Sequence, residues 1–380
     1  MEFTCEKKDL QSGVSVVEKI VTTRSTLPII GNMLFEAGKD SVKISANNLE
    51  MGIEIKIKAK VTKEGSVLIP AKTLSGFVAK LPNEKVMFKL SEKGIIRISY
   101  GSSHFNIHTL PPDEFPVLPK IKAGKSFRVN AQIFALMIKQ TIFSASTSEE
   151  KYVLTGVLLE TGKSQLTGDN SNFRLVATDG YRLAKRGESI KDVDGKVSII
   201  IPARALQELL RIFNTDDAEE AEVVITISDD QVTFKYKDVY LVSRLIQGQF
   251  PDYKQVIPKK SITQVQVSVK SLLESAERSA IIASGSANIV RFEIKNKKLH
   301  LAASTPDVGT IDESLEAEIK GEEKNQVAFN IRLITDMLKV IGTSNVMIEL
   351  TSALGPGVIK EDGPGDYLYI VMPIRTQEAG

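Results

Sequence analysis

Cysteine, histidine and long apolar runs are all scarce in this chain. Its 380 residues include one cysteine, Cys5, and three histidines. A single cysteine excludes an internal disulfide and any metal site built from several cysteines, and it suits a reducing compartment. Cys5 lies in a predicted opening strand, where we expect a small core residue. No apolar run approaches the length that a bilayer requires, and residues 1–8 do not resemble a secretory signal, so we expect a soluble cytoplasmic protein without membrane contact.

Net charge is also nearly absent, since 49 Lys and Arg residues are balanced by 47 Asp and Glu residues. Such a chain has no global attraction for nucleic acid or membranes, so any basic surface must be local. No phosphate-binding GxxxxGK[ST] loop is present, and we do not expect the chain to use ATP itself. His104 and His108 share one face of a predicted strand, but no third ligand accompanies them. We therefore expect no metal, no cofactor and no catalytic activity.

What the chain does contain is one module that occurs three times. Each copy is a short apolar strand followed by an amphipathic helix, at Ser66–Leu81, Ser198–Phe213 and Asn325–Ile341. In the central copy Pro202 is suited to start the helix, and apolar residues then recur at the spacing of one buried face. The apolar positions of the three copies are Leu74, Phe77, Val78 and Leu81; Leu206, Leu209, Leu210 and Phe213; and Ile334, Met337, Leu338 and Ile341.

A cation occupies the same place on the outer face of each module. Lys72, Arg204 and Arg332 precede the first apolar position by two residues, whereas Arg211 and Lys339 follow it by five. Basic helix faces without aromatic stacking residues suit contacts to duplex phosphates that do not read the base sequence. The alternative is an ordinary solvated helix face. We prefer the phosphate hypothesis because the pattern occurs three times.

The rest of the chain repeats an order of strand, helix, strands, strand, helix and strands. The first helices are predicted at about 8–21, 131–143 and 271–282. Two proline-rich segments, Pro111–Pro119 and Gln249–Pro258, share a Phe-Pro pair and separate the repeats. The predicted domains are therefore 1–121, 122–258 and 259–380, and each is an α+β domain in which two helices cover one face of antiparallel sheet.

Local signals refine this plan. The Asp179-Gly180 pair predicts a hairpin turn within Phe173–Lys185, and this turn explains Thr178-Asp179-Gly180 more simply than a catalytic turn does. Gln165–Leu166 is predicted to be a short strand, and the segments around Pro356 and Pro364 are predicted to be loops. Sheets of this kind leave exposed edge strands, which can pair edge to edge around a closed ring. In such a ring the basic helix faces line either the hole or the rim.

Six short segments occur in a characteristic order along this triple repeat. They are Arg24–Asn32, Phe115–Pro116, Val176–Ala184, Phe250–Tyr253, Ala328–Asn330 and Val371–Arg375. With them, essentially the whole chain resembles the bacterial DNA polymerase III beta subunit family, the replication sliding clamps. The resemblance implies three clamp domains with two helices each on the inner face, closing as a homodimer into a six-domain ring around duplex DNA. Such a ring is a non-catalytic processivity factor that slides without sequence specificity.

The resemblance also implies partners and site residues. The expected partners are double-stranded DNA, a second copy of the chain, the DNA polymerase III catalytic subunit, an ATP-driven clamp loader, and other polymerases and repair proteins that carry a clamp-binding peptide. DNA contacts are expected at Arg24, Lys72, Lys139, Lys151, Tyr152, Arg204, Arg211, Arg332 and Lys339. A peptide cleft between domains two and three is expected at Leu154, Thr178, Gly180, Tyr181, Arg182, Leu183, Pro251, Val256, Ile370, Met372, Pro373, Ile374 and Arg375. The dimer interface is expected at Phe105, Ile107, Ile281 and Ile282.

Some positions depart from the family pattern. Tyr181 replaces a histidine, Gln255 stands where an arginine is common, and five residues follow Arg375. Charged residues are few around the expected dimer interface, so we predict that ring closure depends more on apolar burial than on salt-sensitive pairs. The competing hypothesis is a triple-repeat scaffold protein that does not encircle DNA and whose basic faces are incidental.

Overall fold

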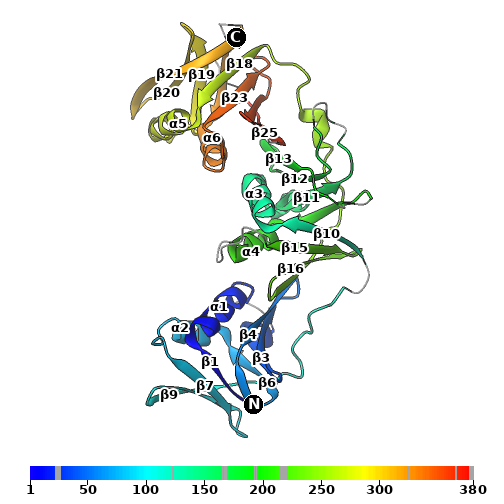
Figure 1. Ribbon diagram of the computed structural model, residues 1–380. Helices are drawn as coiled ribbons and strands as arrows, with labels where there is room; N and C mark the ends of the chain where they lie inside the picture. The colour runs from blue at the N-terminus through cyan, green and yellow to red at the C-terminus, as the bar shows by residue number, and fades with distance from the viewer. Residues whose placement is uncertain are drawn as a thin grey trace. The chain divides into compact units, whose positions relative to one another are not determined.

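The computed structural model describes residues 1–21, 27–121, 124–164, 166, 169–191, 193, 195–213, 221–322, 325–363 and 366–375. The chain forms two compact units (Figure 1). The first consists of Met1–Gln132 and Glu208–Leu245, and the second of Ile133–Gln207 and Ile246–Gly380. Each unit combines antiparallel sheet with helices, so the predicted α+β class is confirmed.

The first unit contains a five-stranded and an eight-stranded sheet. Across the smaller sheet the strands are β5 (Lys60–Lys63), β1 (Glu2–Glu6), β7 (Lys85–Leu90), β8 (Ile95–Tyr100) and β9 (Ser103–His108). Across the larger sheet they are β10 (Lys125–Asn130), β15 (Glu222–Ile227), β16 (Gln231–Tyr236), β17 (Val239–Arg244), β4 (Met51–Lys58), β3 (Ser41–Asn47), β2 (Asn32–Ala37) and β6 (Gly65–Pro70). Helices α1 (Lys7–Glu18) and α2 (Ala71–Val78) lie side by side, and α1 packs on β3 and β4 (Figure 1).

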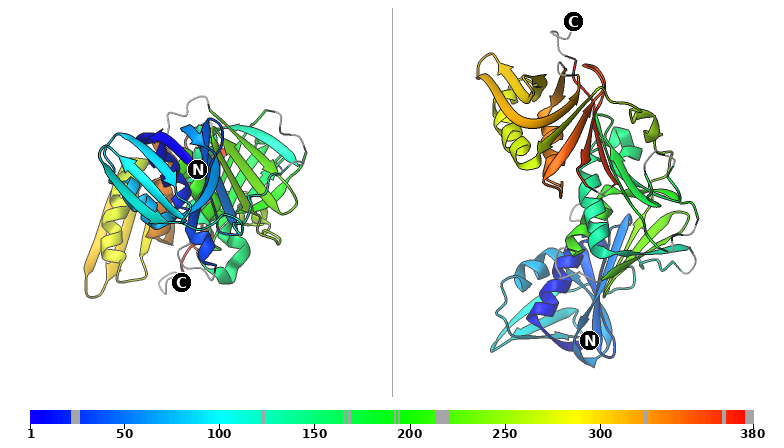
Figure 2. Two further views of the ribbon diagram at one scale, coloured as in Figure 1. Left: turned by 90° about the horizontal axis from the view of Figure 1, so that it is seen from below. Right: turned by 45° about the horizontal axis from the view of Figure 1, so that its top comes forward.

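The second unit is built on one twelve-stranded sheet. Its strands are, in order, β14 (Ser198–Pro202), β11 (Gly156–Thr161), β12 (Phe173–Thr178), β13 (Arg182–Glu188), β25 (Asp366–Val371), β24 (Gly357–Glu361), β23 (Asn345–Leu350), β18 (Thr263–Ser268), β21 (Gly309–Gly321), β20 (Lys298–Thr305), β19 (Ile289–Lys295) and β22 (Gln326–Asn330). Helices α5 (Val269–Ala283) and α6 (Ile331–Leu338) lie side by side, and α5 packs on β18 and β20 (Figure 2).

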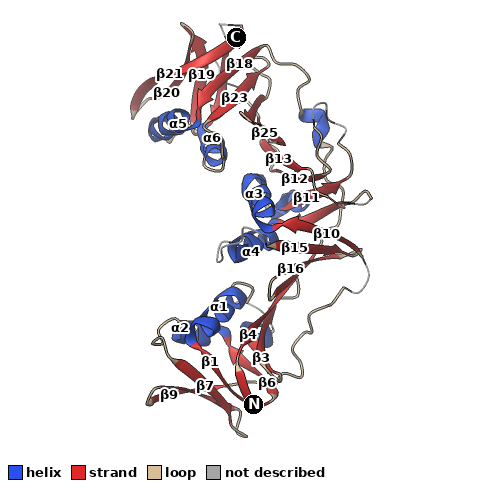
Figure 3. Cartoon of the chain, in the orientation of Figure 1, coloured by secondary structure: helices blue, strands red, loops and turns tan. Residues whose placement is uncertain are grey.

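The remaining helices are short or are shared by the two units. Helices α3 (Ala131–Thr141) and α4 (Ala203–Phe213) each have residues in both units. The 3-10 helices are η1 (Pro28–Gly31), η2 (Ile142–Ser144), η3 (Glu149–Thr155) and η4 (Tyr253–Val256). In the cartoon coloured by secondary structure, the proline-rich segment before β10 runs as extended loop, as its prolines predict (Figure 3).

Strands of successive repeats pair at two seams, one in each unit. At the N-terminal seam β17 pairs with β4, in a register that places Ser243 opposite Met51. At the C-terminal seam β13 pairs with β25, and Leu183 lies opposite Ile370. Both pairings are antiparallel and satisfy backbone groups that an edge strand leaves open. The predicted edge-to-edge pairing of the repeats is therefore confirmed at these two places.

The three predicted strand-helix modules are also confirmed. They correspond to β6 with α2, β14 with α4, and β22 with α6. Most of the apolar positions predicted to face the core are buried, among them Leu74, Leu206 and Ile334 at 0 % exposure. In the third copy the Asn330 side chain accepts a hydrogen bond from the backbone N–H of Arg332 and caps α6. The 3.6-residue apolar period thus predicted the burial of these helices correctly.

Three local predictions were wrong or incomplete. Leu166 lies in a bend instead of a strand, because its N–H donates to the Ser164 hydroxyl and not to a neighbouring strand; its predicted companion Gln165 is outside the described residues. Gly357 begins β24 and is not loop, because it pairs with Val371 of β25. A Cβ there would lie 2.6 Å from Phe329 Cζ, so only glycine allows the ring so close. Helix α1 ends at Glu18 and not near residue 21 as predicted, although Ile20 just beyond it is buried.

The core of the first unit contains a stack of three phenylalanines. Phe3 and Phe88 have ring centroids 4.6 Å apart, and Phe35 lies 6.1 Å from Phe88. All three rings are fully buried. Cys5 is buried beside them on β1, as predicted, and burial raises the pKa of its thiol to about 12. A thiol with so high a pKa is an unreactive core side chain at neutral pH.

Candidate functional site

A tight turn connects β12 to β13 at the C-terminal seam. Asp179 Oδ1 accepts hydrogen bonds from the backbone N–H groups of Tyr181 at 2.8 Å and Arg182 at 3.0 Å. Thr178 Oγ1 accepts the N–H of Gly180 at 3.1 Å, and Gly180 has a φ of +92°, which favours glycine. The turn is therefore held by its own side chains, as the Asp-Gly pair predicts.

Arg182 fastens this turn to the C-terminal repeat. Its Nε donates to Asp179 Oδ2 at 3.0 Å, and its Nη1 donates to Asp336 Oδ2 of α6 at 2.7 Å. The guanidinium also lies over the Phe143 ring at 5.4 Å from its centroid. On the other side of the turn, the N–H of Met372 donates to the Tyr181 carbonyl at 2.9 Å. The segment after β25 is thereby held against the turn.

An apolar cluster lies beside the turn. Leu183 and Ile370 are both buried in it, and Leu154 packs against it from η3. Phe250 and Tyr253 of the second linker belong to the same cluster. The structure thus brings together Leu154, Leu183 and Ile370, which the resemblance placed in one cleft, although they come from three separate segments.

Large side chains remain exposed around this cluster. Tyr181 is 64 % exposed and Met372 is 40 % exposed, although both are large and apolar. On the linker, Pro251 and Val256 are exposed, and on the turn Thr178 is buried and Gly180 is exposed. After β25, Pro373 and Ile374 are half-buried and Arg375 is exposed. An exposed aromatic side chain and a flexible methionine beside a buried apolar floor suit a short peptide with large apolar residues.

Three cations of β13 bind carboxylates of the C-terminal repeat. Arg182 contacts Asp336, Lys185 contacts Asp366 at 2.7 Å, and Arg186 contacts Glu361 at 2.8 Å. The Lys185 and Arg186 side chains are 2 % and 9 % exposed. Sequence reasoning missed this row because each partner lies far away along the chain. The only sequence signal for these ion pairs was the close spacing of Arg182, Lys185 and Arg186 along the chain.

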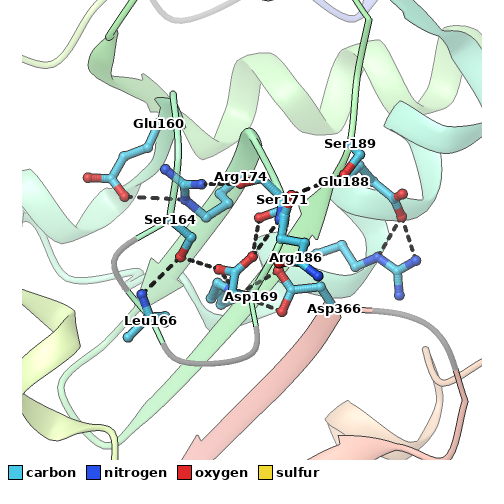
Figure 4. Close-up of polar contacts among 12 residues, drawn as sticks. Glu160, Ser164, Leu166, Asp169, Ser171, Arg174, Arg186, Glu188, Ser189 and Asp366 are labelled. Atoms are coloured by element: carbon cyan, nitrogen blue, oxygen red, sulfur yellow. Dashed lines mark hydrogen bonds and ion pairs between the residues drawn. The ribbon is translucent and has the colours of Figure 1, made fainter.

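Lys185 is the centre of a buried network that includes Asp169 and Asp366, which Figure 4 labels. Its ammonium lies 2.8 Å from Asp169 Oδ2 and 2.7 Å from Asp366 Oδ2. Ser164 and Ser171 donate their hydroxyl groups to Asp169, as the dashed lines in the close-up show. One buried ammonium thus lies between two carboxylates, with every hydroxyl group directed at Asp169. This network joins the loop before β12 to the first residue of β25.

Acid should weaken the second unit through Asp169. Burial by itself would raise its pKa, but hydrogen bonding with Asp366, Lys185, Ser164 and Ser171 lowers it below the usual 3.8. The pKa of the neighbouring Asp366 is raised instead, by burial and by Asp169. A lowered pKa contributes stability that is present above pH 3.8 and is lost as the pH falls through the folded-state pKa. We expect Asp169→Asn to be less stable than the parent at pH 5 and to lose less stability between pH 3.8 and pH 2. Urea midpoints of the parent and the variant at pH 3.8 and at pH 2 test this. Equal losses of stability in the two proteins would contradict it.

The cations predicted to contact DNA are exposed wherever the structure describes them. Lys72, Lys139, Arg204 and Arg332 are exposed on α2, α3, α4 and α6. Two further cations pair with carboxylates: a guanidinium nitrogen of Arg211 lies 2.6 Å from Glu208 Oε1, and the Lys339 ammonium lies 3.2 Å from Glu277 Oε1. The Lys151 ammonium donates to the Asp179 carbonyl, and Tyr152 is exposed on η3. Arg24 is outside the described residues. Each strand-helix module therefore presents an outward cation at the same place.

The residues predicted at the dimer interface differ in exposure. Ile281 is 68 % exposed on α5, and Ile282 is half-buried. Phe105 is half-buried and stacks on Phe77 with centroids 4.1 Å apart. Ile107 is only 5 % exposed within the single chain. Ile281 is therefore the most exposed of the four residues.

Fold and site together define a three-repeat binding protein. The part of the chain that the structure describes contains no group of three His, Cys, Asp or Glu side chains arranged for a metal. Over the same residues no helix is both long and apolar enough to cross a bilayer. The features that remain are repeated basic helices, seams of paired strands, and an apolar surface beside the Asp179 turn.

Comparison with known proteins identifies the family. Models of the N-terminal, central and C-terminal domains of the DNA polymerase III beta subunit match residues 1–119, 128–252 and 254–375. The chain belongs to the DNA polymerase III beta subunit family, the bacterial sliding clamps, and it has their three clamp domains. A member of this family is a non-catalytic accessory subunit of DNA polymerase III that acts in DNA replication as a DNA-binding processivity factor.

Individual relatives are similar over nearly the full chain. The beta sliding clamp of Synechococcus elongatus is 32% identical over 383 residues, which cover 99% of this chain and 100% of the relative. The solved sliding clamp of Bacillus subtilis has a TM-score of 0.92 at 30% identity, with 99% of both chains covered. The DNA polymerase III beta subunit of Thermotoga maritima has a TM-score of 0.90 at 31% identity, also with 99% of both chains covered. The scaffold hypothesis has no support in these comparisons.

Proposed function

We propose that two copies of this chain close head to tail into a ring that encircles duplex DNA and slides along it. The observation that carries this proposal is the outward cation that recurs in all three strand-helix modules, at Lys72, Arg204 and Arg332. Exposed cations that are screened by salt hold phosphates weakly, which permits sliding. Head-to-tail contact would bury Ile281 and Phe105 at the remaining sheet and helix edges. The proposed domains are residues 1–121, 122–258 and 259–380, and the proposed compartment is the cytoplasm.

The apolar surface at the C-terminal seam is proposed to receive a short extended peptide from each partner. The partners are the DNA polymerase III catalytic subunit, the ATP-driven clamp loader, and other polymerases and repair proteins with such a peptide. Leu183 and Ile370 provide the floor, and Met372 adapts to the anchor side chain. The Lys151 ammonium lies 4.9 Å from the centroid of the Tyr181 ring. A cation and an aromatic ring are thus available together on one side of this surface.

Retention on circular DNA tests the ring. Clamps loaded on a nicked plasmid should co-elute with it in gel filtration and should be released when the plasmid is cut once. The test variant has alanine at all five module cations, namely Lys72, Arg204, Arg211, Arg332 and Lys339. We expect the plot of log DNA affinity against log salt concentration to become less steep by at most about 5, which is near one for each cation lost. The matched control replaces five exposed strand lysines, Lys56, Lys58, Lys60, Lys235 and Lys320.

Two results would count against the proposal. Retention on linear DNA without blocked ends would exclude a topological link. An unchanged salt slope in the five-alanine variant would exclude the helices as the DNA-contacting surface. The variant Leu183→Ala with Met372→Ala separates the two sites, because it should keep the clamp on circular DNA and lose stimulation of the polymerase.

A further inference from the structure

The hydrogen-bonded frame of the Asp179 turn occurs a second time, at the N-terminal seam. Between β3 and β4, Asn48 Oδ1 accepts the backbone N–H groups of Glu50 at 3.1 Å and Met51 at 2.7 Å. Asn47 Oδ1 accepts the N–H of Leu49 at 2.8 Å. These bonds match, one for one, those that Asp179 and Thr178 make to the turn before β13.

The backbone of the two turns also agrees. Leu49 has a φ of +76°, at the place where Gly180 has +92°. The N–H of Arg244, the last residue of β17, donates to the Glu50 carbonyl at 2.9 Å, as the N–H of Met372 does to the Tyr181 carbonyl. A leucine in the left-handed region costs conformational energy that glycine would avoid. The turn is therefore held by the rest of the seam and not by the preference of its own residue.

A pocket of about 210 Å³ lies at this second turn, within the first unit. It is lined by the turn residues Leu49 and Glu50, by Pro116 and Val117 of the first linker, and by Gln231 and Arg244. A volume below the roughly 300 Å³ of small-molecule sites suits one anchoring side chain. Val117 is 89 % exposed, so the linker presents an apolar wall to solvent. The side-chain amide of Asn47 donates to the Pro116 carbonyl at 3.2 Å and fixes this wall to the turn.

The floor of the pocket differs from that of the C-terminal seam. Gly52 takes the place that Leu183 has after the other turn, and a Cβ at this position would lie 1.9 Å from Leu118 Cδ2. Leu118 of the linker covers the strand at Gly52, at 8 % exposure, and the apolar lining of the pocket comes from Val242 and Met51. With glycine where the other seam has leucine, the pocket accepts a smaller anchor than a surface floored by Leu183 and Ile370 would accept.

Charge defines what fits at the rim. Arg244 of β17 and Glu50 of the turn before β4 are both exposed at the pocket, and the described residues offer no ion pair to either. They replace the apolar Met372 and Tyr181 of the other seam. One cation and one carboxylate beside a single apolar pocket complement a segment that carries both charges around one aliphatic side chain.

We propose that this pocket is a second docking site, for an extended peptide segment of a partner protein in which an acidic and a basic residue flank an aliphatic residue. The inference rests on the proposed peptide-binding role of the C-terminal seam, whose frame it shares. The two sites differ in preference, since one is apolar throughout and the other is bordered by opposite charges.

Fluorescence anisotropy with labelled decapeptides tests the proposal on the full chain. The probes have blocked ends, alanine flanks and a central Glu-Leu-Lys, Lys-Leu-Lys, Glu-Leu-Glu or Glu-Ser-Lys. We expect the Glu-Leu-Lys probe to bind most tightly and the Glu-Ser-Lys probe at least about tenfold more weakly, because it lacks the anchor. Arg244→Glu should change the preference to Lys-Leu-Lys, and Glu50→Lys should change it to Glu-Leu-Glu. The matched control Lys235→Glu, an exposed cation of the same sheet, should change nothing.

The outcomes separate this inference from the proposed function. Loss of Glu-Leu-Lys binding in Leu183→Ala but not in Arg244→Glu would place the probe at the C-terminal seam and overturn the inference alone. Absence of any probe binding, or unchanged preferences in both charge variants, would also overturn it. If a probe with glutamine and large apolar residues fails to bind while Glu-Leu-Lys binding depends on Arg244, the proposed function of the C-terminal seam fails and the second site stands.

Discussion

Replacing Lys185 by methionine should lower the free energy of unfolding of the second unit by about 3–5 kcal/mol at pH 7. The substitution keeps the length of the side chain and removes its charge. Asp169 is 4 % exposed at its side chain and Asp366 is 29 % exposed, so two carboxylates would be left without their shared cation. The penalty arises mostly from this uncompensated buried charge. Urea denaturation followed by a probe in the second unit measures the change.

A compensated variant separates charge from packing. Adding Asp169→Asn and Asp366→Asn to Lys185→Met removes all three charges, and we expect it to recover a large part of the loss. Lys320→Met, an exposed lysine on β21, is the control and should change stability by less than about 0.5 kcal/mol. A loss below about 1 kcal/mol in Lys185→Met, or no recovery in the triple variant, would show that the network contributes little to the C-terminal seam.

Replacing Phe88 by alanine should lower the free energy of unfolding of the first unit by a similar amount, about 3–5 kcal/mol. Phe88 is fully buried, and its ring centroid lies 4.6 Å from that of Phe3 and 6.1 Å from that of Phe35, which are themselves 6.5 Å apart. Its removal takes away a ring that contacts both of the others and leaves a cavity that rigid strands cannot close. Thermal and urea unfolding of the full chain would measure the loss.

The neighbouring residue supplies the control. Met87 is on the same strand with its side chain on the opposite, solvent-facing side, and it is 41 % exposed. Met87→Ala should therefore cost less than about 1 kcal/mol. Equal losses for the two variants would mean that the strand, and not the aromatic stack, determines the effect of Phe88→Ala.

The repeated organisation was predictable because its signals are local. The apolar period of Leu206, Leu209 and Phe213 and the phenylalanine-proline pairs of the linkers can be read within a few turns of helix or a short loop. Where a local signal had two meanings, the prediction failed. Gly357 lies in a Gly-Pro-Gly segment typical of a loop, but it begins a strand because it pairs with the distant Val371, and it is glycine because the Phe329 ring fills the space of a side chain.

The candidate site was predictable only in part. The segment Val176–Ala184 carries the Asp179 turn, and its resemblance to the family indicated a peptide-binding role. The contacts that hold the turn were not predictable, because Arg182 reaches Asp336 of α6 across 154 positions of sequence. The pocket at the Asn48 turn gave no sequence signal at all, since Asn47-Asn48-Leu49 lacks the glycine that marks the turn before β13.

The sequence alone determined the class of fold, the three repeats, the linkers and the faces of the helices, because periodicity, proline and turn residues act over short distances. Only the tertiary structure decided which strands pair across repeats, which cations lie against buried carboxylates and which lie in solvent, and where a turn frame recurs. Burial and pairing between distant segments depend on how the whole chain packs, and a short stretch of residues does not contain that information.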